Sequence, residues 1–279
     1  MKIAGTILKI LIAGIAIVVF QTIADAIVPI NVHMPPGTLP WVLVTDFLTA
    51  AALVLAATRT DWRGWRLGVA ISAIPVTFSL TSMIESSIFL TNLPIDWPRI
   101  VAQSVITFEL AVPLWMLLFA KRGPGSPEPY RPIDSRPPQE ALWKFFASDL
   151  SYLLLYYIAG TIVLPFVKDF YATQTLPPPG RLIAMQLVVR GPIFVGICLL
   201  LLRLVRLPRW SGALAVGAIF TVLNGVTALL IPNPYLPDAV RWAHLCEVTS
   251  SNFVFGAIVG WLWGQRNLAA RQPSGPALP

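Results

Sequence analysis

Charged side chains are scarce in this sequence. They make up 12% of the 279 residues, whereas soluble proteins carry about 25%. Hydrophobic residues make up 56%, so the chain lacks the polar side chains needed to cover a folded surface that faces water. This composition argues against a soluble enzyme, a nucleic-acid-binding protein and a secreted disulfide scaffold, and it predicts an integral membrane protein.

Cysteine and histidine are also rare. Cys198 and Cys246 both lie in apolar segments, which argues against a disulfide framework and against a CxxC metal site. His33 and His244 are the two histidines of the chain. The sequence also lacks the EExxxR, GxSxG, HExxH and Walker motifs of known intramembrane enzymes and ATPases. We therefore expect no metal, no cofactor and no use of ATP.

Long apolar runs are abundant, and about 20 such residues cross a bilayer as a helix. Eight segments qualify, at about residues 7–30, 41–58, 67–90, 100–120, 150–167, 182–202, 210–231 and 242–263. The runs are continuous rather than alternating, which excludes a β-barrel. The first run has no small-residue cleavage site, so it is interpreted as an uncleaved helix rather than a signal peptide. The predicted fold is an all-α integral membrane protein with about eight transmembrane helices.

The basic residues are unevenly distributed between the loops. With a cytoplasmic N-terminus, fifteen Lys and Arg residues fall on the cytoplasmic side and four on the outer side, while Arg190 lies within a span. Inner loops of membrane proteins carry such an excess of positive charge. The count predicts that both termini are cytoplasmic, and it accounts for the net charge of +7 without nucleic acid.

Short stretches of the first half recur in the same order in the second. The matches are residues 23–29 with 158–165, 35–37 with 178–180, Trp65 with Trp210, and 93–94 and Arg99 with 236–237 and Arg241. Each half holds four spans and so has the same orientation, which predicts two parallel four-helix repeats related by an axis along the membrane normal. The expected units are repeat one (1–120), a Pro-rich cytoplasmic linker (121–142), repeat two (143–264) and a disordered cytoplasmic tail (265–279).

Ionisable residues within spans are costly and often functional, although helix packing is the competing explanation. They are Asp25, Asp46, Glu85, Glu109, Arg190, His244 and Glu247. Nearly all fall in the outer half of the bilayer at 1.5 Å per residue, which predicts a polar cavity open to the outer face. The candidate ligand-binding residues are Glu85, His244, Glu247, Ser251 and Asp25.

Two further expectations concern helix contacts. Arg190 stays charged and needs a partner. Asp46 aligns with it in the repeat, which predicts a structural ion pair between Asp46 and Arg190, with Asp25 and Glu85 as substitute partners. Asn252, Gly256 and Gly260 recur every four residues and predict a face for close helix packing.

Two stretches resemble a known group of proteins. The residues are Met83-Ile84-Glu85 with Phe89, and residues 231–237 followed by Val240-Arg241, His244, Glu247 and Ser251-Asn252-Phe253. They are similar to uncharacterised bacterial eight-helix inner-membrane proteins. The resemblance implies a bacterial inner membrane and an eight-helix topology over most of the chain, and it implies no activity, substrate or catalytic residue.

Three classes of function remain open. The first is a small secondary transporter or receptor, for which the excess of acidic groups favours proton coupling or a cationic ligand. The second is an intramembrane enzyme on a lipid-linked substrate, with Glu85 or Glu247 and His244 as acid and base. The third is a non-catalytic membrane module that stabilises or regulates a partner. The expected partners are membrane lipids and a small or cationic ligand, with no nucleic acid.

Overall fold

The computed structural model describes residues 3–30, 34–90, 95–120, 136–232 and 234–264, and every regular element in these ranges is helical. The α-helices are α1 (Ile3–Ile27), α2 (Thr38–Ala57), α3 (Gly64–Phe89), α4 (Trp97–Leu118), α5 (Pro138–Tyr171), α6 (Pro179–Met185), α7 (Gly191–Val205), α8 (Arg209–Thr221), α9 (Thr227–Leu230) and α10 (Asp238–Trp263). Two π-helical turns, Gln186–Arg190 and Val222–Val226, join α6 to α7 and α8 to α9.

Eight of the resulting helical stretches in the described residues are long and apolar enough to cross a membrane. This number confirms the prediction from the apolar runs. Large hydrophobic side chains point outward from several helices, among them Leu117, Phe166 and Val188, each more than 70% exposed. Outward-facing apolar side chains are expected of helices surrounded by lipid rather than by water.

Helix α5 begins at Pro138, about three turns before the predicted start of its span near residue 150. Its first turns carry charged side chains that are held by hydrogen bonds. Glu140 accepts hydrogen bonds from Arg136 and Lys144 at 2.5 and 2.6 Å, and Arg136 also donates to the carbonyl of Trp263 at 2.6 Å. The last residues of the expected linker are therefore helical, because polar contacts extend a helix beyond its apolar run. Residues 121–135 and the tail 265–279 lie outside the described part.

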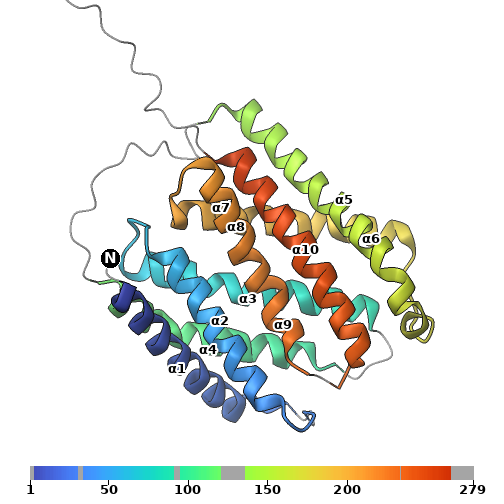
Figure 1. Ribbon diagram of the computed structural model, residues 1–279, viewed down its shortest axis with the longest axis horizontal. Helices are drawn as coiled ribbons and strands as arrows, with labels where there is room; N and C mark the ends of the chain where they lie inside the picture. Colours follow the sequence, from blue (N-terminus) through green and yellow to red (C-terminus); the bar gives the residue numbers. More distant parts are fainter. Residues whose placement is uncertain (1–2, 31–33, 91–94, 121–135, 233, 265–279) are drawn as a thin grey trace, which may run out of the picture.

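The eight membrane-crossing stretches pack as two groups of four. The first group holds α1 to α4, and the second holds α5 to α10 with their two π-helical turns (Figure 1). In the first group, α1 packs on α2 and α4, and α4 packs on α3. In the second group, α5 packs on α7 and α10, and α10 packs on α8. The groups meet where α2 contacts α7, α9 and the second π-helical turn. The bundle has a terminal end, where the described chain starts and ends, and an opposite end, where α3 and α5 end and α10 begins.

Five aromatic rings form the centre of the core. They are Phe78, Tyr152, Phe194, Phe220 and Phe255, from α3, α5, α7, α8 and α10, and all are buried. Their rings meet edge to face with centroids 5.1–5.9 Å apart, an arrangement that adds to the stabilisation from burial alone. The cluster fixes four of the second group's elements against α3.

Helices α8 and α10 lie in close contact, as the spacing of Asn252, Gly256 and Gly260 predicts. A Cβ on Gly256 would lie 2.8 Å from the Cα of Gly217, and one on Gly260 would lie 2.6 Å from the Cα of Ala213. Neither position has room for a side chain. Small residues thus bring the two backbones together over two turns.

Candidate functional site

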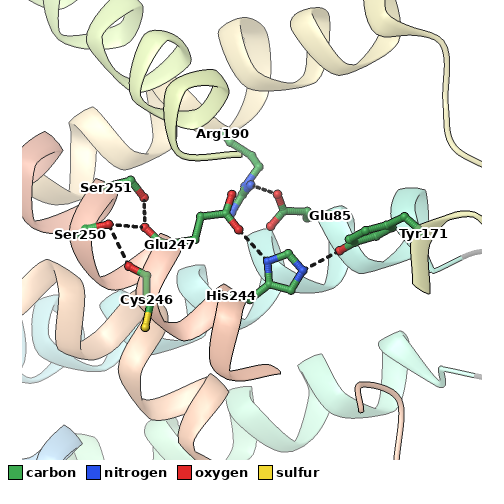
Figure 2. A network of polar contacts seen from close by, with 8 residues as sticks. All are labelled: Glu85, Tyr171, Arg190, His244, Cys246, Glu247, Ser250 and Ser251. Atoms are coloured by element: carbon green, nitrogen blue, oxygen red, sulfur yellow. Dashed lines mark hydrogen bonds and ion pairs between the residues drawn. The ribbon is translucent and has the colours of Figure 1, made fainter. Parts of the chain in front are cut away.

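Five polar side chains meet at the opposite end of the bundle (Figure 2). Glu85 comes from the last turn of α3, Tyr171 from the end of α5, Arg190 from the first π-helical turn, and His244 and Glu247 from the first turns of α10. We call these five residues the polar cluster. Three of them, Glu85, His244 and Glu247, are sequence-predicted site residues that the structure brings to one end of the fold.

Arg190 forms an ion pair with Glu85 through Nη1 and Oε1. The Arg190 side chain is 7% exposed and that of Glu85 is 28% exposed. The guanidinium lies 5.0 and 5.8 Å from the ring centroids of Phe194 and Tyr152. Arginine suits this place because its planar, weakly hydrated group stacks on aromatic rings while it binds a carboxylate.

The predicted ion pair between Asp46 and Arg190 is wrong. The Oδ2 atom of Asp46 is buried without a hydrogen-bond partner in the described part of the chain, and the partner of Arg190 is Glu85, which the sequence offers as a substitute. Equal depth in two helices does not fix the direction in which a side chain points. The π-helical turn before Gly191 adds a residue to its turn and changes this direction for Arg190.

Glu247, His244 and Tyr171 form a chain of hydrogen bonds. His244 Nδ1 lies 2.6 Å from Glu247 Oε2, and His244 Nε2 lies 2.9 Å from the Tyr171 hydroxyl. With Glu247 ionised, Nδ1–H donates, because a carboxylate only accepts. A neutral imidazole then accepts from Tyr171 at Nε2, whereas an imidazolium donates at both nitrogens. The imidazole of His244 can therefore gain or lose one proton while it keeps both hydrogen-bond partners, Glu247 and Tyr171.

The ion pair and the hydrogen-bond chain lie close to each other. Figure 2 shows Arg190 between the carboxylates of Glu85 and Glu247. Helix α5 also passes close to Glu247, since a Cβ on Gly160 would lie 3.5 Å from Oε1. With a neutral His244, two carboxylates and one guanidinium leave the cluster with a formal charge of −1.

Ser251 and Asp25 are not brought into this cluster. The Ser251 hydroxyl donates to the backbone carbonyl of Glu247 at 2.8 Å, which occupies it within its own helix. Asp25 is exposed on α1 and accepts a hydrogen bond at 2.6 Å from Gln103 on α4. Glu109 is exposed on α4 as well.

Tyr171 is a member of the cluster that the sequence does not reveal. A tyrosine at the end of a span fits an interfacial aromatic belt equally well, so only its contact with His244 shows a different use. The side chains of His244 and Glu247 are 18% and 13% exposed, so both retain some access to the surroundings. In the described residues, no group of three or more His, Cys, Asp or Glu side chains is arranged to hold a metal ion.

A shallow apolar groove lies elsewhere, at the start of α3. It is lined by Trp62, Trp65, Arg66, Val69 and Ala70, at the terminal end of the bundle and away from the polar cluster. The predicted polar cavity open to the outer face stays a prediction.

Comparisons with known proteins add no relative. No protein-family model, no curated protein and no solved structure matches the chain. Its function has to be inferred from the polar cluster itself.

Proposed function

We propose that the protein crosses a bacterial inner membrane eight times and that its polar cluster binds a small cationic ligand in exchange for a proton, as a small secondary transporter does. One observation carries this proposal. Arg190 lies between two carboxylates but forms its ion pair with Glu85, whereas the side-chain partner of Glu247 is the imidazole of His244, so one fixed positive charge serves two acidic groups. A carboxylate in apolar surroundings without a fixed counter-charge favours either a proton or a cation beside it.

The exchange follows from the hydrogen-bond chain. When a cation is bound at Glu247, His244 is neutral and accepts from Tyr171. When the cation leaves, a proton on the imidazole restores the balance of charge, and the contacts of 2.6 and 2.9 Å persist with His244 donating to both neighbours. The same five residues thus serve both states.

The two groups of four helices support the proposed parallel repeat. The first span of each group packs on the second and the fourth, and the fourth packs on the third. The ion pair between Glu85 and Arg190 joins the third span of one group to the second span of the other. A rocking motion of one group against the other, as repeat-built transporters use, would make and break this pair.

The charge count in the loops supports an orientation with both termini in the cytoplasm. The polar cluster then lies in the outer half of the membrane, where a ligand from outside reaches it first.

Binding of ethidium, a fluorescent organic cation, tests the proposal on the purified full-length protein. In a weakly buffered solution, a pH indicator should report release of about one proton per bound ethidium, because the cation replaces the proton of the cluster. Glu247→Gln should abolish this release and weaken binding. Glu109→Gln is the matched control, since it makes the same change on the exposed face of α4. Equal binding and proton release in both variants would contradict the proposal.

The order of Tyr171, His244 and Glu247 also favours a second function. Hydroxyl, imidazole and carboxylate in a row form the arrangement by which enzymes activate a nucleophile, which fits an intramembrane enzyme on a lipid-linked substrate. Release of p-nitrophenol from a p-nitrophenyl acyl ester by the wild type, and its loss in Tyr171→Phe, would favour this function over cation exchange.

A further inference from the structure

A line of polar or small residues runs along α5 at every fourth position. Its members are Glu140, Lys144, Ser148, Tyr152, Tyr156 and Gly160. Lys144, Ser148 and Tyr152 are buried, and Gly160 faces Glu247 of the polar cluster. At 1.5 Å per residue the line covers about 30 Å. It therefore links the polar cluster to the terminal end of the bundle, where Lys144 bonds to Glu140.

Asp149 lies beside this line at the level of the first π-helical turn. It is 6% exposed, and its Oδ1 has no hydrogen-bond partner in the described residues. A Cβ on Gly191 would lie 1.9 Å from this oxygen and 2.8 Å from the carbonyl oxygen of Gln186. The Gln186 carbonyl accepts the Gly191 N–H across the π-helical turn, so Oδ1 of Asp149 lies against this turn without a donor.

Among the described residues, Asp149 has no ion-pair partner. On its own helix, Lys144 bonds to Glu140 and Tyr152 is uncharged. On the π-helical turn, Arg190 bonds to Glu85. On α10, the neighbour of Ser148 is the indole of Trp263 at 3.1 Å. A buried carboxylate without a counter-charge is costly, so a proton on Asp149 removes the cost.

Gln186 provides a second set of polar atoms at this level. Its side chain is fully buried, and neither its Nε2 nor its Oε1 has a hydrogen-bond partner in the described part. Buried amides in proteins are normally bonded to protein or water. The interior one turn before Arg190 therefore has donors and acceptors that suit proton transfer through bound water.

We propose that Asp149 is a proton-binding residue on a pathway along α5, which connects the polar cluster with the terminal end of the bundle. On transfer toward the terminal end the O–H bond of the protonated Asp149 carboxyl breaks and an O–H bond forms on a bound water molecule. A proton arriving by way of the hydroxyls of Tyr156 and Tyr152 then restores the carboxyl. The pathway rests on the proposed proton exchange at Glu247.

Infrared spectroscopy of the full-length protein in lipid nanodiscs at neutral pH tests the protonation directly. The wild type should show the C=O stretching band of a protonated carboxylic acid, and Asp149→Asn should lose part of this band. Asp169→Asn is the matched control, because Asp169 is exposed near the other end of the same helix. A band that Asp149→Asn leaves intact would overturn the assignment.

Proton flux into liposomes tests the pathway. With a trapped pH-sensitive dye and a potassium diffusion potential, Asp149→Asn should slow proton entry at least about tenfold, as expected when a proton-transfer residue is removed, whereas Asp169→Asn should not. Asp149→Ser repeats the test if the asparagine variant folds poorly. Unchanged flux in a folded variant would overturn the pathway.

The two proposals fail in different ways. If the wild type neither binds ethidium nor releases a proton, cation exchange at the polar cluster fails. If ethidium binding and proton release are intact in the wild type and in Asp149→Asn, but flux is equal in the two proteins, the pathway through Asp149 alone fails.

Discussion

Arg190 and Glu85 are 105 positions apart in the chain, and their ion pair joins the two groups of four helices at one end of the bundle. The arginine is almost fully buried against Phe194 and Tyr152. Loss of Glu85 therefore leaves a buried guanidinium without its ion-pair partner.

Glu85→Gln should destabilise the protein by roughly 3 kcal/mol, the lower part of the range for breaking a buried pair, because Glu85 keeps some exposure. Arg190→Gln added to Glu85→Gln should recover part of the loss. Unfolding of the detergent-solubilised protein, followed by tryptophan fluorescence, measures both. Asp46→Asn serves as the comparison. If Arg190→Gln recovered the loss of stability caused by Asp46→Asn instead of the loss caused by Glu85→Gln, the result would contradict the ion pair between Arg190 and Glu85.

Gly256→Ala should destabilise the protein by about 1–3 kcal/mol, because the added methyl group meets the backbone of Gly217 at 2.8 Å and forces α8 and α10 apart. Gly196→Ala makes the same change on α7, where nothing lies within 4 Å. A thermal shift of the detergent-solubilised protein compares the two. Equal melting temperatures would show that the close contact is absent.

Single cysteines at positions 85 and 247 should react with a membrane-impermeant thiol reagent added from outside, because both side chains retain partial exposure. The background must lack Cys246, which is exposed beside the site, and Cys198. A cysteine at position 109 is the control, because it lies on the outward face of α4 within a span and an impermeant reagent should leave it unlabelled. Labelling from the cytoplasmic side alone would place the cluster on the wrong face.

Reporter fusions test the orientation. Fusions after Arg63 and Arg206 should report the cytoplasm, because the loops that hold these residues are rich in Lys and Arg. Fusions at Pro36 and Thr175 should report the outside. An alternating pattern of opposite sign would reverse the topology, and with it the face that the cluster serves.

The sequence was a good guide to the helices, because length and apolar character alone decide which segments can cross a bilayer. It misplaced the start of α5, since the contacts of Arg136 and Glu140 lie outside any apolar run. It also anticipated the packing of α8 on α10, because glycines spaced by four residues have few other uses in a span.

The site was predicted only in part. Depth along a helix is readable from the sequence, and it correctly placed Glu85, His244 and Glu247 near one end. The alignment of the two halves gives Asp46 and Arg190 equal depth, but it does not give the direction of either side chain, and the π-helical turn changes that direction for Arg190, whose partner is Glu85. Asp149 gave no signal, because its relation to Gly191 depends on how α5 lies against α7.

The contact between Gly256 and Gly217 has a mechanical consequence. Backbones that are in close contact at two successive turns resist sliding and tilting against one another, because the atoms would collide. We therefore expect α8 and α10 to move as one rigid unit. Any displacement of His244 and Glu247 must then carry the second π-helical turn with it. Because that turn contacts α2 and α3, we expect a displacement in the cluster to reach the boundary between the two groups of helices.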